Sequence, residues 1–141
     1  MQQIGVKRPK VAIISATESV NEKIKATVDA KALCDMAAEG AFGNTVVEGP
    51  MGLDLALSRR SADIKGYESQ VSGDVDLLLA PDLNAGNILF KSLVYAARAE
   101  AAGVILGAKV PIVLTSRSDS AYSRLASCAM AAALVQTADI F

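Results

Sequence analysis

The sequence predicts an α/β protein in which a mostly parallel sheet is covered by helices on both sides, a three-layer α/β/α arrangement. Short, solidly apolar runs alternate along the chain with longer segments whose apolar residues recur at helical spacing. Hydrophobic residues make up 52% of the chain and aromatic residues only 4%, so we expect a core of small aliphatic side chains that pack closely between helix and sheet. A length of 141 residues suits one domain or part of a larger protein.

Five runs rich in β-branched and other apolar residues are the candidate strands, and they cover residues 11–15, 45–49, 76–81, 104–108 and 111–115. Pro50 is expected to end the second strand, and the third is expected to be buried on both faces. Only Lys109 and Val110 separate the last two runs, which is too short a link for a parallel crossover within one sheet. These two strands therefore either form an antiparallel pair or belong to different sheets.

Four segments place apolar residues three and four positions apart and are predicted to be helices: 27–40, 53–58, about 88–102 and about 120–135. Residues 59–74 are charged and polar, and we expect them to form a loop. The expected inward faces of the three longer helices are Val28, Ala32, Leu33, Met36 and Ala37; Leu89, Leu93, Ala96 and Ala97; and Leu125, Ala129, Ala132 and Val135.

Composition excludes several classes of function. The net charge is −1 and no stretch concentrates lysine and arginine, so nucleic acid is not an expected partner. The N-terminal residues do not show the basic start followed by an apolar segment that is typical of a signal peptide, and no uncharged apolar run reaches about eighteen residues. These observations predict a soluble cytoplasmic protein without a membrane span. The chain has no histidine, which removes Ser–His and Cys–His nucleophile pairs and imidazole metal ligands. Cys34 and Cys128 are expected to be buried thiols, and no metal site is predicted.

Polar residues replace apolar ones where three of the predicted strands end, at residues 15–23, 81–87 and 116–120. In open α/β sheets, ligands bind at the carboxyl ends of strands, close to helix N-termini. In the second segment Asn84 and Asn87 offer amide donors and acceptors, and Gly86 lets the backbone approach a ligand. The alternative is structural, with Asn84 capping the helix and Gly86 lying in a turn.

The third segment, which follows PIVLT (111–115), points more sharply to an anion. Arg117 offers a planar fork of donors suited to phosphate or carboxylate oxygens. Thr115 ends the strand, and hydroxyls follow at Ser116, Ser118 and Ser120. Asp119 could cap the following helix, orient Arg117 or accept a proton. The pattern predicts an anion-binding site built around Arg117.

Several of these stretches together resemble the phosphate acetyl/butyryltransferase family, and phosphate butyryltransferases more than the short acetyltransferases. LNAGNIL-x-K and P-I-V-L-T-S-R-x-D-S are the specific motifs, and the ending SRLASCAMA is also similar to the transferase part of bifunctional enoyl-CoA hydratase/phosphate acetyltransferases. The likeness covers nearly the whole chain, through residues 9–24, 27–37, 46–58, 71–93 and 107–134.

The resemblance implies a fold of two α/β domains like those of isocitrate and isopropylmalate dehydrogenases, with the active site in the cleft between them. Family members are about twice as long, and what stands here resembles their C-terminal half. Residues 1–104 would belong to the second, middle domain and residues 105–141 would return to the first. A homodimer is also implied.

The resemblance further implies reversible transfer of an acyl group between coenzyme A and inorganic phosphate, through an acyl phosphate, with coenzyme A as a substrate and no cofactor. Ser116 and Arg117 fall on the family's catalytic Ser-Arg pair, and Asp119 on the aspartate of its S-R-x-D pattern. The acetyltransferases instead carry an aspartate six residues after the arginine, where this chain has Ser123. Substrate-binding positions implied are Asn84, Gly86, Asn87, Thr115, Ser118 and Ser120.

Two other functions are weighed against this one. The chain could be a catalytically inactive fragment or regulatory module that binds phosphate or coenzyme A, because most of one wall of the implied cleft is missing. A dehydrogenase is disfavoured, since the sequence has neither a G-x-G-x-x-G fingerprint nor a carboxylate cluster for a metal.

Overall fold

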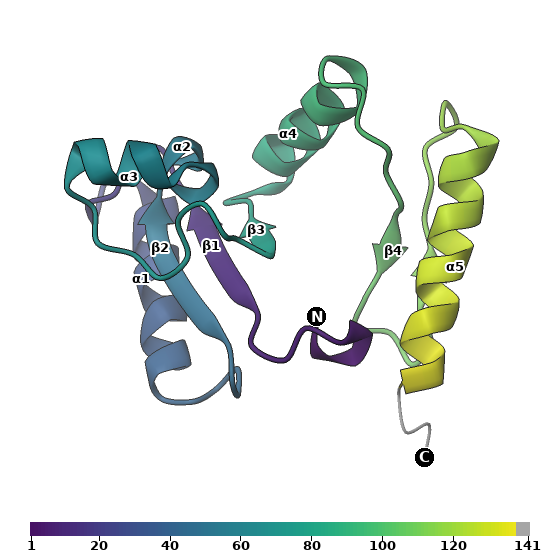
Figure 1. Cartoon of the computed structure of the whole chain (residues 1–141), viewed down its shortest axis with the longest axis horizontal. Helices are drawn as coiled ribbons and strands as arrows, with labels where there is room; N and C mark the ends of the chain where they lie inside the picture. The colour runs from purple at the N-terminus through teal and green to yellow at the C-terminus, as the bar shows by residue number, and fades with distance from the viewer. Residues whose placement is uncertain (138–141) are drawn as a thin grey trace. The chain divides into compact units, whose positions relative to one another are not determined.

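The computed structural model describes residues 1–137 (Figure 1). The chain divides into two compact units, Lys7–Ile88 and a second unit that combines Met1–Val6 with Leu89–Phe141. Each unit has its own sheet, and the division falls inside helix α4 (Leu83–Tyr95). The predicted assignment of 1–104 and 105–141 to two domains of a longer protein stays a prediction.

The first unit contains a three-stranded sheet in the order β2–β1–β3, formed by β1 (Lys10–Ile14), β2 (Val46–Met51) and β3 (Leu77–Leu79). Both pairings are parallel, with Val11 opposite Val47 on one side and Leu77 on the other. The predicted α/β class with a parallel sheet is therefore confirmed.

Strand β2 does not end at Pro50, as the sequence predicted, but continues to Met51. The pairing register shifts there, because Ala12 lies opposite Glu48 whereas Ile14 lies opposite Met51. This irregularity gives β2 one residue more than β1, as in a β-bulge, which is a position that tolerates a proline without an N–H. The ladder resumes with the N–H of Ser15, which donates to the Met51 carbonyl at 2.9 Å.

Strand β3 is not buried on both faces, which corrects a second prediction. Leu77 and Leu79 are 36% and 40% exposed. Within residues 1–137, β3 pairs only with β1 and so lies at an edge of the sheet. An apolar run by itself does not distinguish an edge strand from a central one.

Helices α1 (Lys25–Ala38), α2 (Leu53–Leu57) and α3 (Arg59–Lys65) complete the first unit. Helix α3 occupies a segment predicted to be a loop. Its start is capped by Ser58, whose Oγ accepts the Ser61 N–H at 3.1 Å, and its end by Gly66 in the left-handed region at φ 63°. The sequence shows no apolar pattern for this helix, because most of its residues are charged or polar and only one side chain, Ala62, is buried. The buried core cluster is Ala12, Met51, Leu55, Ala56, Ala62 and Val71.

The inward face of α1 is also rotated from the predicted one. Thr27 and Ala30 are fully buried, whereas Val28 and Met36 are exposed. Thr27 is inward because its hydroxyl serves the turn before the helix, accepting the Asn21 N–H at 2.8 Å. Threonine counts as polar when apolar periodicity is used to find a buried face. The predicted face of α1 therefore started at Val28, whereas the observed buried face starts at Thr27.

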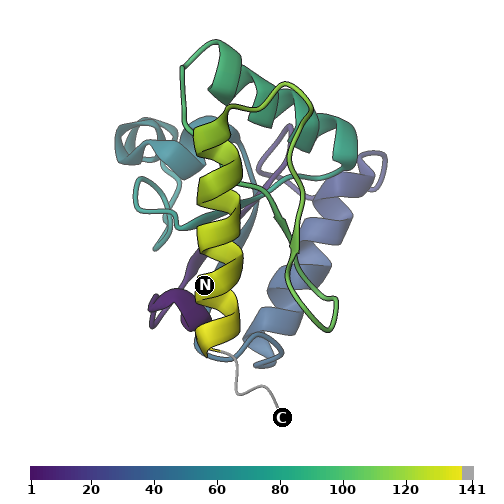
Figure 2. The same ribbon diagram turned by 90° about the vertical axis from the view of Figure 1, so that its right-hand side faces the viewer.

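The second unit contains η1 (Gln2–Ile4), most of α4, β4 (Val104–Ile105), β5 (Ile112–Val113) and α5 (Ala121–Thr137). Strands β4 and β5 are an antiparallel pair, with Val104 opposite Val113, so the first of the two alternatives left open by the sequence is correct. Helix α5 runs alongside this pair, as Figure 2 shows.

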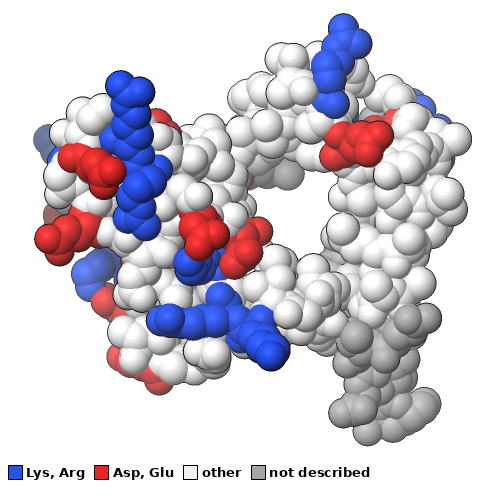
Figure 3. Space-filling view, viewed as in Figure 1, with Lys and Arg blue, Asp and Glu red and all other residues white. Residues whose placement is uncertain are grey.

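The apolar faces predicted for the second unit are exposed. Leu125 is 69% exposed, and Leu93, Ala96, Ala97, Ala129, Ala132 and Val135 are exposed too. The fully buried residue of α5 is Ser127, and the visible face of α5 in Figure 3 is mostly uncharged. Cys128 is likewise exposed, contrary to prediction, whereas Cys34 is half-buried and its Sγ donates to the Gly49 carbonyl at 3.3 Å. Within residues 1–137, no helix is long and apolar enough to cross a membrane.

Candidate functional site

The loop Thr115–Ser120, between β5 and α5, contains most of the predicted site residues in one tight turn. The Ser116 N–H donates to Asp119 Oδ2 at 2.6 Å, and the Asp119 N–H donates back to the Ser116 carbonyl at 3.0 Å. These two contacts close the chain over four residues and leave Arg117 and Ser118 exposed at its tip. Asp119 therefore holds the turn that presents Arg117.

Arg117 makes no hydrogen bond or ion pair within residues 1–137. An arginine held at the tip of a turn, with all five donors uncommitted, can receive the oxygens of a phosphate or a carboxylate. Ser116 and Thr115 are half-buried on the strand side of the same turn. The arrangement suits an anion that approaches from the exposed side of the loop.

Ser120, the last residue of the loop, and Arg124 of α5 have structural roles. Ser120 caps α5, because its Oγ accepts the Ser123 N–H at 3.0 Å. Of the roles weighed for Asp119, capping is therefore wrong, and the residue after it does the capping. Arg124, one turn further along α5, fixes the same segment by donating from Nη2 to the Asp119 carbonyl at 3.2 Å.

A chain of hydroxyl groups crosses the loop. The Tyr95 hydroxyl lies 3.0 Å from Ser118 Oγ, and Ser118 Oγ lies 3.1 Å from Ser116 Oγ. Ser116 and Ser118 come from the predicted site, but Tyr95, at the end of α4, was not singled out in the sequence. All three residues belong to the same unit.

A glycine anchors the strands behind the loop. The Gly103 N–H donates to Ser127 Oγ of α5 at 2.9 Å, and the Gly103 carbonyl accepts the Leu114 N–H at 3.1 Å. Ser127 Oγ in turn donates to the Ser123 carbonyl at 2.7 Å. A side chain at Gly103 would lie 2.1 Å from the Leu114 carbonyl oxygen, so only glycine fits between the helix and the strand.

Asn84, Gly86 and Asn87 belong to the other unit and lie in the first turns of α4, which begins at Leu83 and ends at Tyr95 instead of covering 88–102. The helix cap is Asp82, whose Oδ1 accepts the Ala85 N–H at 2.9 Å, and not Asn84. Gly86 is helical, and its N–H donates to the Asp82 carbonyl at 3.0 Å, so it does not lie in a turn. Asn84 and Asn87 are both exposed and, three positions apart, share a face of the helix.

In the first polar segment, residues 15–23, Glu18 belongs to a small ion-pair cluster with Lys65 and Asp54. Lys65 Nζ lies 2.9 Å from Glu18 Oε1 and 3.1 Å from Asp54 Oδ2. These hydrogen bonds lower the pKa of both carboxyls and raise the pKa of Lys65. The Glu18 carboxylate is therefore paired with a lysine of α3, in contrast to Arg117.

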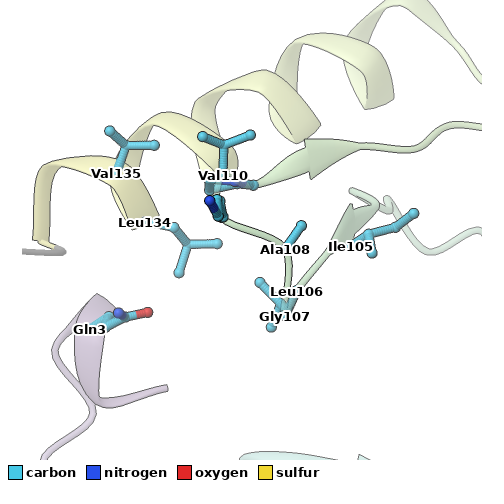
Figure 4. A pocket seen from close by; sticks show the side chains of 10 residues that line it. Gln3, Ile105, Leu106, Gly107, Ala108, Val110, Leu134 and Val135 are labelled. Carbon is cyan, nitrogen blue, oxygen red and sulfur yellow. The ribbon is translucent and has the colours of Figure 1, made fainter. Parts of the chain in front are cut away.

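Away from the site loop, the second unit contains an apolar cavity of about 290 Å³ at the turn that joins β4 and β5. Figure 4 shows Ile105 to Ala108 on one side and Leu134 and Val135 of α5 on the other, with Gln3 nearby. Its lining contains one charged residue, Lys109, and none of the predicted site residues. Among residues 1–137, no cluster of side chains suited to a metal ion is found.

Comparison with known proteins gives consistent matches. A family model described as phosphate acetyl/butaryl transferase matches residues 1–132. A phosphate acetyltransferase from Rhizobium meliloti is 53% identical over 129 residues, which cover 92% of this chain and 41% of that protein. A probable phosphate butyryltransferase from Bacillus subtilis (strain 168) is 48% identical over 128 residues, covering 91% and 43%.

Among solved structures, a branched-chain phosphotransacylase from Enterococcus faecalis V583 matches with a TM-score of 0.84 and 40% identity. The match covers 95% of this chain and 48% of that one. The chain thus spans less than half the length of each of these three proteins.

Proposed function

The chain belongs to the phosphate acetyl/butyryltransferase family, and on that premise we propose that it carries part of the active-site cleft of a phosphate acyltransferase. The reaction is acyl-CoA plus inorganic phosphate giving acyl phosphate plus coenzyme A, with acetyl or butyryl as the acyl group. The observation that carries the proposal is the Ser116–Asp119 turn, which holds an unpaired arginine at its exposed tip.

Arg117 binds the phosphoryl oxygens, since its guanidinium can form two parallel hydrogen bonds to them. Ser116 lies next to it, and its hydroxyl donates to the ligand held at Arg117. The acceptor is a phosphate oxygen when phosphate alone is bound, and the acyl oxygen that gains negative charge in the transition state of the reaction. Thr115, Ser118 and Ser120 complete the substrate-binding side of the loop. The positive N-terminal end of α5 adds a favourable field for an anion at this position.

In the direction of acyl-CoA synthesis, the thiol of coenzyme A gives its proton to the Asp119 carboxylate. The sulfur then forms a bond to the carbonyl carbon, and the bond from that carbon to the phosphate oxygen breaks, so phosphate leaves with the electron pair. Support for Asp119 is that Oδ2 is already hydrogen-bonded to the Ser116 N–H, which keeps the carboxylate beside the reacting groups. Asn84, Gly86 and Asn87 are proposed as further substrate contacts.

The whole protein is proposed to have two α/β domains resembling those of isocitrate dehydrogenase, to be a homodimer and to be cytoplasmic. The exposed apolar residues of α4 and α5, Leu93 and Leu125 among them, support burial against further polypeptide. Two free cysteines, Cys34 and Cys128, are the state expected in a reducing compartment.

The test is release of free thiol from acetyl-CoA or butyryl-CoA plus inorganic phosphate. It is run on the 141-residue chain and on the longest polypeptide that the reading frame around it encodes. We expect turnover by a polypeptide that includes the part of its relatives' length that this chain lacks, and none by the 141 residues alone. If such a polypeptide folds and releases no thiol with either substrate, the assignment is wrong.

The second candidate is a catalytically inactive fragment or regulatory module that binds phosphate or coenzyme A. The observation that favours it is that the chain spans 41% of one relative and 43% of another. The same assay separates the two functions, because a longest polypeptide of only 141 residues that binds phosphate without turnover is the outcome expected of a binding module.

A further inference from the structure

Three hydroxyl groups from different parts of the second unit form a hydrogen-bonded row. Tyr95 comes from the last turn of α4, and Ser118 and Ser116 come from the loop after β5. The two contacts, of 3.0 Å and 3.1 Å, are within normal hydrogen-bond length for hydroxyl pairs. Such a row is polarised as a whole, so the direction of the first donor sets the direction of the others.

The chemistry of the groups favours Tyr95 as the first donor. A phenol, with a pKa of about 10, is a stronger hydrogen-bond donor and a weaker acceptor than the aliphatic hydroxyl of a serine. Lys91 Nζ also lies 5.6 Å from the centre of the Tyr95 ring, and a cation there draws electron density from the ring. With Tyr95 donating to Ser118 and Ser118 donating to Ser116, Ser116 Oγ accepts within the row.

The consequence concerns the proton of Ser116. A free serine hydroxyl rotates to suit its neighbours and can present either its proton or its lone pairs to a ligand. Once Ser116 Oγ accepts from Ser118, its own O–H is left to point out of the row. The Ser116 N–H already donates to Asp119 Oδ2, so the backbone of Ser116 is fixed as well.

We propose that Tyr95 is a positioning residue that acts through Ser118 to direct the O–H of Ser116 toward the anion bound at Arg117. This inference rests on the proposed function, because it assigns a role in the same phosphate-binding loop. Tyr95 itself does not touch the substrate. Its effect on the site is transmitted through two hydrogen bonds.

The test measures binding of inorganic phosphate to the ¹⁵N-labelled 141-residue chain, from the amide shifts of residues 115–120 at constant ionic strength. Tyr95→Phe removes the hydroxyl and keeps the ring, and we expect it to raise the phosphate dissociation constant about three- to tenfold. Ser118→Ala, which also removes a proposed substrate contact, should raise it at least as much, and adding Tyr95→Phe to Ser118→Ala should give no further rise. The matched control is Tyr122→Phe, an exposed tyrosine on α5 outside the row.

A background substitution distinguishes positioning from a general effect on the loop. With Ser116→Ala in place, Tyr95→Phe should leave phosphate affinity unchanged, because the group through which it acts is gone. A further loss in that background would overturn the proposal. The proposal would also be overturned if Tyr95→Phe, like the control Tyr122→Phe, left the phosphate dissociation constant unchanged while Arg117→Ala abolished binding. That result would not contradict the proposed function. A wild-type chain without phosphate-dependent shifts in this loop would overturn the positioning proposal, whereas the proposed function is decided separately by thiol release from the longest polypeptide.

Discussion

Replacing Arg117 by alanine is expected to lower kcat/KM for acyl transfer by about 10²–10³, the usual cost of removing one charge-stabilising donor from a transition state. The reason is that Arg117 is exposed at the tip of a fixed turn and makes no ion pair within residues 1–137. Its charge is therefore available to the substrate. The measurement is thiol release by the longest polypeptide of the reading frame, with acetyl-CoA and butyryl-CoA.

Two further variants sharpen this result. Arg117→Lys keeps the charge but loses the planar fork, so its activity should lie between those of the wild type and of Arg117→Ala. Arg60→Ala removes an exposed arginine of α3, in the other unit, and should leave the rate unchanged. Equal rates for Arg117→Ala and Arg60→Ala would remove Arg117 from the site.

Replacing Gly103 by alanine is expected to destabilise the second unit by on the order of 3 kcal/mol, as overpacking of a rigid site does. The added carbon would lie 2.1 Å from the Leu114 carbonyl oxygen, a backbone atom that cannot turn away. Relief requires β4 to move off β5, which breaks the Leu114 N–H contact to Gly103 and shifts the chain just before Thr115. Chemical denaturation of the variant measures the loss of stability.

Gly107→Ala is the control for this prediction, because it adds the same carbon in the turn that joins the same two strands. Nothing lies within 4 Å of that carbon, and its cost comes only from a φ of +91°, about 1–2 kcal/mol. Amide shifts of residues 115–120 should change in Gly103→Ala and stay near their wild-type values in Gly107→Ala. A Gly103→Ala chain as stable as Gly107→Ala would contradict the role given to Gly103.

Much of the architecture was predictable because it depends on local apolar patterns. The runs at 11–15, 45–49 and 76–81 became the three parallel strands, with boundaries that shifted by a few residues. The short link at Lys109 and Val110 allowed only two arrangements, and the antiparallel one is present. These features need no knowledge of what each segment packs against.

Some of the predictions that failed depend on contacts between segments distant in sequence. Whether β3 is central or at an edge depends on its neighbours, and Pro50 is tolerated in β2 only because the register with β1 shifts beside it. The exposed faces of α4 and α5 show the same limit. An apolar stripe indicates which face would be buried, but not whether the chain supplies a surface to cover it.

The candidate site contains both features that the sequence could predict and features that it could not. Ser116, Arg117 and Asp119 could be selected because a strand ends there in a polar run, and the turn that joins them spans only four residues. At the start of each helix the sequence offers more than one residue that could act as the cap. The cap of α5 is Ser120 and not Asp119, and the cap of α4 is Asp82 and not Asn84. Tyr95 was missed because its partner, Ser118, lies 23 residues further along the chain.

The most direct test of the central claim is an experimental structure of the longest polypeptide with coenzyme A and inorganic phosphate bound. The account predicts that phosphate oxygens contact the Arg117 guanidinium and that Ser116 Oγ lies within hydrogen-bond distance of the bound anion. The thiol of coenzyme A should lie on the same side, near Asp119. Phosphate and coenzyme A bound together at a place that leaves Arg117 and Ser116 in contact with solvent alone would contradict it.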